Sequence, residues 1–289
     1  MTADKRCVLI TGCSTGIGEA AALRLDRAGW RVFAGVRREE DGRRLLERGS
    51  PTLQWVLLDV TDRDSVRAAA ARVETAVGSR GLDGLVNNAG IAVGGPLEFL
   101  PETRLRRQFE VNVFGLLAVT QALLPLLRRA RGRVVNIGSV SGLIASPMIG
   151  PYSASKHAVE ALTDAMRLEL APWGIEVSIV DPGPVRTPIW DKGEQSMAQA
   201  ADEYPPAARE MYQMHFAAFR RILAHTSRNG MAPERPAALI ERALTVSRPR
   251  PRYILGLQSR FRLLLQRALP RRWMDALVLR VLRRAAARP

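Results

Sequence analysis

The feature that most constrains this chain is a repeated alternation, over residues 6 to 180, of short β-branched runs with stretches of helical periodicity. The expected strands are 7–11, 31–36, 53–58, 84–89, 133–138, 176–180 and a late one at 253–256. Helical patterns lie near 17–28, 62–77, 102–129 and 152–172. Because the strand runs are nearly continuous in Val, Ile and Leu, each is expected to be buried on both faces. The sequence therefore predicts an α/β fold: a doubly wound (Rossmann), mostly seven-stranded parallel sheet with helices on both faces, plus a helical C-terminal tail.

The composition agrees with one folded domain and a tail. With 47% hydrophobic and 25% charged residues, the chain is neither disordered, nor collagen-like, nor a disulfide scaffold. No low-complexity linker divides it, so we expect a main domain at 1–257 and a tail at 258–289. Cys7 and Cys13 give no disulfide framework and no metal-ligand pattern, which favours a cytoplasmic protein without a metal. The apolar stretch near the start and the one at 114–127 are too short for a signal peptide or a membrane span.

A glycine-rich turn follows the first expected strand. Residues 11–18 read TGCSTGIG and lead into a helical pattern. A helix N-terminus offers unpaired N–H groups, and glycines let a pyrophosphate approach the backbone, so this context predicts a dinucleotide site. A tight turn that is merely rich in glycine is the alternative, because the spacing is GxxxGxG and not the commoner GxGxxG.

Tyr152 and Lys156 stand four residues apart at the start of an expected helix, which places them on one face. A phenol with a pKa of about 10 is a poor base, but a nearby ammonium favours the phenolate. The pair can then exchange a proton with an alcohol or a ketone. The alternative interpretation is an exposed Tyr and a solvated Lys without a catalytic role. That Lys156 is one of only three lysines among 43 basic residues weakens this alternative.

Taken together, these segments resemble the short-chain dehydrogenase/reductase family over about residues 6 to 260. The matching motifs occur in the family's order: the turn at 11–18, Asp59 after the third strand, NNAG at 87–90, Asn112, Ser139 thirteen residues before Tyr152, Lys156, and DPGPVRT at 181–187. The resemblance implies that Ser139 binds the substrate oxygen, that Tyr152 transfers the proton, and that Lys156 holds the nicotinamide ribose. It gives Asn112 the role of holding a water in a proton relay. Ser141 is a weaker candidate for the serine role because of its spacing.

The resemblance also implies a set of cofactor-binding residues. They are Gly12, Ser14, Thr15, Gly16, Ile17, Gly18, Asp59, Val60, Asn88, Ala89, Gly90, Tyr152, Lys156, Pro182, Gly183, Val185 and Thr187. The choice of cofactor depends on the end of the second strand, where NAD-dependent relatives usually carry an acid and this chain has Val36. Arg37 and Arg38 follow it, and guanidinium groups suit a 2′-phosphate. We therefore expect NADP(H), with NAD(H) as the alternative.

The segment 188–232 is where the family places its substrate lid, and here it is rich in methionine and aromatic residues. Such side chains suit a large apolar substrate, although ordinary core packing gives similar spacing. The stretches FAGVRREEDGRRL and RPRPRYILG resemble the branch that holds retinol dehydrogenases and 17β-hydroxysteroid dehydrogenases. That resemblance implies a steroid-, retinoid- or lipid-like alcohol or carbonyl compound.

The net charge of +15 is concentrated in the tail: residues 248–289 hold twelve arginines and one acid. No aromatic-interleaved basic patch accompanies them, so we expect no nucleic-acid partner. The tail reads as a basic amphipathic helix, which predicts either peripheral binding to an anionic membrane or a roof over the substrate pocket. The long helices near 102–129 and 152–172 are expected to pair in a homo-oligomer, as in family relatives.

The sequence therefore predicts an oxidoreductase that interconverts an apolar alcohol and its ketone or aldehyde. A non-catalytic dinucleotide-sensing or interaction protein on the same fold is the alternative. Such proteins typically lose the Tyr or the Lys, and this chain keeps both.

Overall fold

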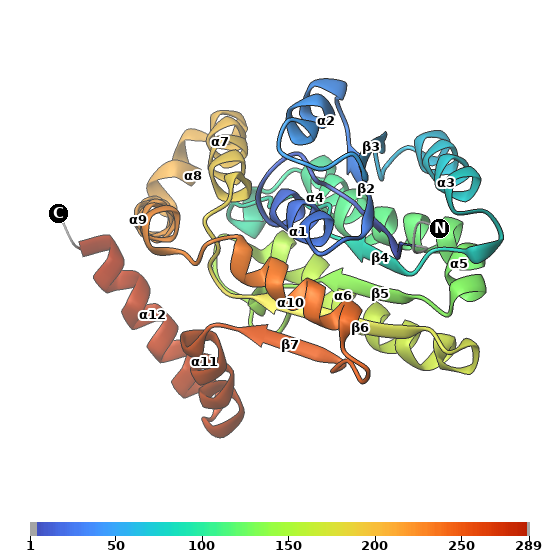
Figure 1. Cartoon of the computed structure of the whole chain (residues 1–289). Coiled ribbons are helices and arrows are strands. Elements are labelled where there is room, and N and C mark those ends of the chain that lie inside the picture. The colour runs from blue at the N-terminus through green and yellow to red at the C-terminus, as the bar shows by residue number, and fades with distance from the viewer. Residues whose placement is uncertain (1–4, 288–289) are drawn as a thin grey trace.

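The computed structural model describes residues 5–287 and shows seven parallel strands in one sheet, in the order β3-β2-β1-β4-β5-β6-β7 (Figure 1). The strands are β1 (Cys7–Ile10), β2 (Arg31–Val36), β3 (Leu53–Leu57), β4 (Gly84–Asn87), β5 (Arg133–Ile137), β6 (Glu176–Pro182) and β7 (Arg252–Leu255). The chain order reverses between β1 and β4, and in such sheets ligands bind outside the carboxyl ends of the strands at that point. The predicted doubly wound fold is confirmed.

Helices cover both faces of the sheet, and each face has its own core. On one face lie α3 (Arg63–Val77), α5 (Gly115–Ala130) and α6 (Gly150–Leu170), whose Val73, Leu123 and Val159 are buried against the strands. On the other lie α1 (Gly16–Arg27), α2 (Glu39–Leu46) and α10 (Glu234–Thr245), with Leu25 and Ile240 in the core. The apolar side chains of the strands are buried against both helix layers, as expected from strands that are hydrophobic along their whole length.

The long helical pattern near 102–129 forms three joined pieces. These are α4 (Glu102–Phe109), the π-helical segment η3 (Glu110–Phe114) and α5. Within the described residues, Glu102–Ala130 is the one helical stretch whose length and composition would allow it to cross a membrane, and 61% of its most apolar window is buried inside the protein. That burial is what a core helix of this sheet requires.

The remaining helices lie toward the carboxyl ends of the strands. They are α7 (Pro188–Glu203), α8 (Pro206–Met211), α9 (Gln213–Asn229), α11 (Leu257–Ala268) and α12 (Arg271–Ala287). Figure 1 shows α7, α8 and α9 together beyond the strand ends, with α12 running past α9. Arg221 of α9 donates hydrogen bonds to the carbonyl oxygens of Ala285 and Ala286, which fixes α12 against α9.

Candidate active site

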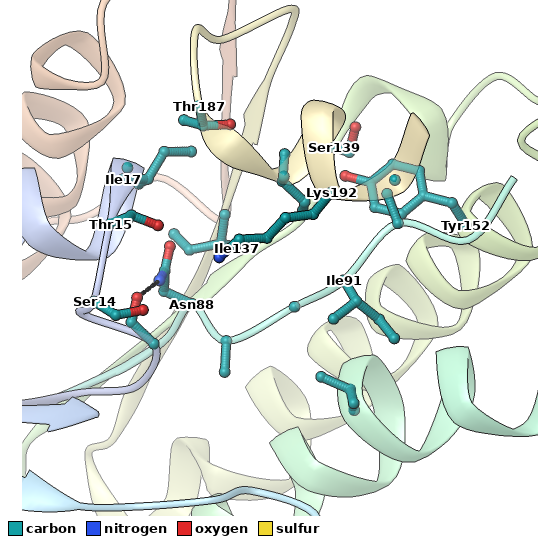
Figure 2. Close-up of a pocket in the computed structure, with 18 of the residues that line it drawn as sticks. Ser14, Thr15, Ile17, Asn88, Ile91, Ile137, Ser139, Tyr152, Thr187 and Lys192 are labelled. Carbon is teal, nitrogen blue, oxygen red and sulfur yellow. Dashed lines mark hydrogen bonds between the residues drawn. The ribbon is translucent and has the colours of Figure 1, made fainter. Parts of the chain in front are cut away.

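A cavity of about 310 Å³ lies at the carboxyl ends of the strands. Figure 2 shows Ser14, Thr15, Ile17 and Asn88 on one side of it and Ser139 and Tyr152 on the other. The predicted site residues that line this cavity are Gly12, Ser14, Thr15, Gly16, Ile17, Arg37, Asp59, Val60, Asn88, Ala89, Gly90, Ser139, Tyr152, Lys156, Pro182, Gly183, Val185 and Thr187. Segments far apart in the sequence therefore meet at one edge of the sheet.

The glycine-rich turn has the backbone that a phosphate cradle needs. Gly12 and Gly16 adopt positive φ angles of 71° and 67°, a conformation that side chains with a Cβ disfavour. Thr15 stands at the N-cap of α1, and its side chain makes no hydrogen bond to the first turn. The helix N-terminus is therefore not capped by its own side chain, and a pyrophosphate fits this turn.

Asn88 and Thr11 lock this turn to the neighbouring strand. The side-chain amide of Asn88 donates to the carbonyl oxygens of Thr11 at 2.9 Å and Gly12 at 3.0 Å. The Thr11 hydroxyl accepts from the backbone N–H groups of Asn88 and Ala89, both at 2.9 Å. Thr11 belongs to the predicted motif but not to the predicted site set, and its role in shaping the turn appears only when β1 and β4 are placed side by side.

Gly18 does not line the cavity, although we predicted it to bind the cofactor. A Cβ at this position would lie 2.3 Å from the Gly12 oxygen and 2.4 Å from the side-chain nitrogen of Asn88. Gly18 therefore serves the close packing of α1 against the turn, and it acts on the cofactor site indirectly.

Ser139, Tyr152 and Lys156 meet at the far end of the cavity. Tyr152 and Lys156 come from the first turns of α6 and are 5% and 6% exposed, and Ser139 follows β5. The Lys156 ammonium donates a hydrogen bond of 2.7 Å to the Ile137 oxygen and lies 5.9 Å from the centre of the Tyr152 ring. The Trp190 ring meets the Tyr152 ring edge-on at 5.7 Å between centroids.

The pKa values of this pair differ from the sequence-based expectation. Burial raises the pKa of Tyr152 to about 12, opposed by a hydrogen bond to Ser139 and assisted by the charge of Asp181. Burial lowers the pKa of Lys156 to about 8, opposed by Asp181 and Glu160. We expected the ammonium to favour the phenolate, but desolvation of the ring dominates, so Tyr152 is a protonated phenol at neutral pH.

Asn112 lies behind the cavity and does not line it. It is 2% exposed, accepts from the N–H of Ile91 at 2.9 Å, and donates to the Ile91 oxygen and the Ser155 hydroxyl at 3.1 Å each. Its side chain thus ties the π-helical segment to the backbone after β4 and to α6. In this arrangement its amide braces the site, and the water-relay role implied by the resemblance stays a prediction.

The two arginines after β2 have different surroundings. Arg37 lines the cavity, whereas Arg38 does not and pairs with Asp41 at 3.1 Å. The first turn of α2 offers Arg38 a carboxylate, so Arg37 alone of the two lies at the cavity, and the contact of Arg38 with the cofactor stays a prediction. Arg44 also pairs with Asp41, at 3.0 Å, and donates to the Ser14 oxygen at 2.8 Å.

Two further cationic residues, Arg107 of α4 and Lys192 of α7, line the cavity and were not predicted. Burial raises the pKa of Asp59, but hydrogen bonds from Thr61 and the charges of Arg107 and Arg37 hold it below its usual value. Asp59 is therefore ionised beside the cavity. The sequence signal for Lys192 was its rarity as a lysine in this chain; for Arg107 there was none.

The fold and this cavity define a class: a Rossmann-type protein with a dinucleotide cradle at one end of its site and a Ser, Tyr and Lys cluster at the other. Residues 6–198 match the family model for short chain dehydrogenases, and the chain belongs to the short-chain dehydrogenase/reductase family. This confirms the family resemblance seen in its motifs.

Among curated relatives, retinol dehydrogenase 5 of Mus musculus is 39% identical over 292 residues, covering 99% of this chain and 92% of the relative. The NADPH-dependent 3-dehydrocapnine reductase of Ornithobacterium rhinotracheale is 37% identical over 256 residues, covering 87% and 88%. The 17-beta-hydroxysteroid dehydrogenase type 6 of Bos taurus is 40% identical over 264 residues, covering 88% and 81%.

Solved structures agree with the fold. A short-chain dehydrogenase from Burkholderia cenocepacia in complex with NADP aligns with a TM-score of 0.72 and 26% identity, covering 95% of this chain and 98% of that one. One from Burkholderia phymatum in complex with NAD aligns with a TM-score of 0.78 and 26% identity, covering 92% and 94%.

Proposed function

We propose that this protein is an NADP(H)-dependent alcohol dehydrogenase or carbonyl reductase that interconverts an apolar alcohol and its ketone or aldehyde, with Tyr152 as the general acid and base. The observation that carries the proposal is the convergence of Ser139, Tyr152 and Lys156 at one end of a cavity whose other end is the glycine-rich turn. The chemistry that a bound nicotinamide dinucleotide supplies is hydride transfer.

The side chains have distinct tasks in this proposal. The Ser139 hydroxyl binds the substrate oxygen, where negative charge develops during reduction. Because its pKa is about 12, Tyr152 carries a proton at neutral pH and can donate it to an alkoxide, which is a far stronger base. The Lys156 ammonium lies beside the ring and stabilises the phenolate that remains. These protonation states suit the reducing direction at neutral pH.

Substitution of Tyr152 tests this assignment against the alternative of a non-catalytic dinucleotide sensor. Tyr152→Phe keeps the ring and its contact with Trp190, so NADPH should still quench protein fluorescence with nearly the wild-type dissociation constant. Turnover of apolar ketones should fall by about 10²-fold or more, because a positioned proton donor contributes that much. Lys156→Ala should weaken both turnover and nucleotide binding. Wild-type turnover in the Tyr152→Phe protein contradicts the role of Tyr152. NADPH binding by the wild type without turnover of any apolar ketone or alcohol tested favours the sensor.

The proposed preference for NADP(H) rests on Arg37, which lines the cavity after a strand that ends in Val36 and not in an acid. A guanidinium there attracts a 2′-phosphate by charge and by paired hydrogen bonds. One relative is named an NADPH-dependent reductase. Arg37→Gln should lower NADPH affinity at least tenfold and leave NADH affinity unchanged, whereas Arg38→Gln should change neither, since Arg38 is held by Asp41. Equal NADPH and NADH affinity in the wild type, at one ionic strength, would refute the preference.

The proposed substrate is apolar because of what lies beyond Tyr152. A buried apolar cluster there consists of Met148, Met197, Phe219 and Leu223, with Trp190 packed against it. These residues come from the loop before α6, from α7 and from α9. This cluster supports the role of 188–232 as a lid, since methionine and aromatic side chains adapt to large apolar ligands. Relatives named for retinol, for a steroid and for 3-dehydrocapnine agree with a steroid-, retinoid- or lipid-like substrate.

We assign the tail, α11 and α12, to the surface of an anionic membrane as well as to the lid side of the fold. On α12, Met274 and Leu282 are buried, whereas Trp273 is 66% exposed and Val281 52% exposed. The sequence predicted an amphipathic helix with one apolar side. In the structure, part of that side of α12 covers α9 and part faces solvent. On α11, Phe261 is 62% exposed. Exposed arginines surround these residues, namely Arg260, Arg271, Arg272, Arg280, Arg283 and Arg284.

Exposed apolar groups among arginines suit the boundary between headgroups and acyl chains. Co-sedimentation with phosphatidylserine vesicles should be strong at low salt and weak at high salt. The double variant Phe261→Ser with Trp273→Ser should lose most of the bound fraction, while Leu97→Ser, exposed on another surface, should keep it. No binding at low salt would leave the tail only its role beside α9. A cytoplasmic protein that meets the membrane peripherally is the location this proposal implies.

A further inference from the structure

The helix that carries Tyr152 and Lys156 continues the same face to a buried acid. Glu160 follows Lys156 by four residues on α6 and is 7% exposed. Asp181, near the end of β6, is fully buried. Arg252 of β7 donates a hydrogen bond of 2.5 Å to Glu160 and lies 3.7 Å from Asp181. These residues form a second polar layer behind the proposed catalytic pair.

This layer holds more carboxylate oxygens than donors. Within the described residues, Oε1 of Glu160 and both side-chain oxygens of Asp181 accept no hydrogen bond from any donor. Both carboxyl groups nevertheless lie against the same Arg252 guanidinium, Glu160 at 2.5 Å and Asp181 at 3.7 Å, so the two acids are neighbours. Two carboxylates cannot bond without a proton, and buried acceptors without donors are costly. One proton shared between the two carboxyl groups lets them hydrogen-bond to each other and leaves fewer buried oxygens without a donor.

The backbone is built to admit the Asp181 carboxylate. Gly138 follows β5 and donates its N–H to the Val180 oxygen at 2.9 Å. A Cβ on Gly138 would lie 2.0 Å from Oδ1 of Asp181, so only glycine leaves room for this side chain. The carboxyl group therefore occupies a defined place between β5, α6 and β7.

We propose that Asp181 and Glu160 share one proton and that the single negative charge of this pair keeps Lys156 in its ammonium form. Asp181 is then a positioning residue that acts through Lys156. The proposal rests on the proposed function only for the role of Lys156 in turnover; the charge of Lys156 is a property of the free protein.

The charges around Lys156 support the direction of this effect. Burial lowers the pKa of Lys156, and Asp181 first and Glu160 second oppose that change. Burial and the adjacent Glu160 raise the pKa of Asp181, with Arg252 and Lys156 opposing. On the same helix, the charge of Asp164 raises the pKa of Glu160 and that of His157 lowers it. Tyr152 is the remaining titratable group on this face of α6.

The small number of lysines makes a direct test practical. The chain contains Lys5, Lys156 and Lys192, so protein labelled with carbon-13 at the lysine Cε gives three resonances, and Lys156→Arg identifies the one that matters. Titration of its chemical shift toward alkaline pH reports the charge of Lys156 without cofactor or turnover. Glu169→Gln, an exposed acid on the same helix, is the matched control and should not move the midpoint.

The two acid variants should act differently. Asp181→Asn leaves the pair's charge on Glu160, whose effect on Lys156 is the smaller of the two, so the Lys156 midpoint should fall by about one pH unit. Glu160→Gln leaves Asp181 fully ionised and places the whole negative charge on it, so the midpoint should rise. In turnover assays, the alkaline limb of the pH profile of kcat should shift in each variant in the direction of that variant's Lys156 midpoint, with little change in KM.

Other outcomes overturn the proposal. If both variants lower the midpoint equally, both acids are ionised and no proton is shared. If neither moves it, the pair is only structural. Should Asp181→Asn fail to fold, Glu160→Gln alone separates these cases, because a rise supports sharing, an unchanged midpoint makes the pair only structural, and a fall contradicts sharing. The two proposals can fail separately. If the Lys156 midpoint shifts as expected but the Tyr152→Phe variant retains turnover, the proposed function is contradicted and this inference is not.

Discussion

Lys156 should be a cost to the fold at neutral pH, and its replacement by methionine should therefore stabilise the protein. Burial lowers the pKa of Lys156 from 10.5 to about 8. That difference corresponds to about 3 kcal/mol disfavouring the charged form in the native state. Methionine loses the hydrogen bond to the Ile137 oxygen, which costs about 1 kcal/mol. The net gain from Lys156→Met should be about 2 kcal/mol below pH 8.

The pH dependence gives this prediction its signature. Between pH 8 and 10.5 the unfolded chain binds a proton at Lys156 that the native protein has released. The free energy of unfolding of the wild type should therefore rise with pH across this window, by about 3 kcal/mol relative to the variant. Above it, the wild type should be the more stable of the two by about the lost hydrogen bond.

Urea unfolding of both proteins at a series of pH values, with Lys5→Met as an exposed control, measures the difference directly. A constant difference between wild type and Lys156→Met across the window would refute the reasoning. So would a variant less stable than the wild type at neutral pH. The variant should also lose turnover, which separates stability from function at one residue.

Three further outcomes are expected. Gly18→Ala should lower stability by about 1–3 kcal/mol and abolish NADPH binding, because its Cβ would overlap the Gly12 oxygen and the Asn88 amide; a variant that melts and binds like the wild type contradicts this. Trp190→Ala should raise KM for large apolar ketones about tenfold with little effect on NADPH affinity, and a lower kcat with an unchanged KM would argue against the lid contact. We propose that the helical stretches 102–130 and 150–173 pair in a homo-oligomer through exposed Phe114, Leu168 and Trp173. Leu168→Glu should then reduce the mass in light scattering, whereas Leu46→Glu should not; a wild-type monomer removes the interface.

The strands and the glycine-rich turn could be predicted because their signals are local. Val32, Val134 and Val177 sit in runs so apolar that burial on both faces is the one arrangement open to them. The helix α2 was not predicted, because EEDGRRLL is highly polar and contains a glycine. A Cβ on Gly42 would lie 2.5 Å from the Trp55 ring, so the close packing of this helix on β3 depends on tertiary contact.

The site followed the same division. Motif residues within one turn or one strand end, such as Thr15 and Asn88, line the cavity as expected. Spacing along the chain did not show the partners of two other site candidates: Arg38 pairs with Asp41, and Asn112 bonds to Ile91, and neither lines the cavity. The raised pKa of Tyr152 was also missed, because sequence spacing shows the nearby lysine but not the loss of solvent around the ring.

The two ends of the cavity are built from different parts of the chain. The cofactor half comes from β1, β2, β4 and their following turns, and the family match spans residues 6–198 and so stops inside α7. The lid cluster draws on Phe219 and Leu223 beyond that point, and α12 packs on the same α9. Relatives named for retinol, for 3-dehydrocapnine and for a hydroxysteroid match 99%, 87% and 88% of this chain, so differently named substrates accompany one common sequence pattern. Substrate choice in this protein should therefore be decided by α7–α9. Exchanging that segment between relatives should change KM among apolar ketones, while the NADPH preference that we propose should stay with Arg37.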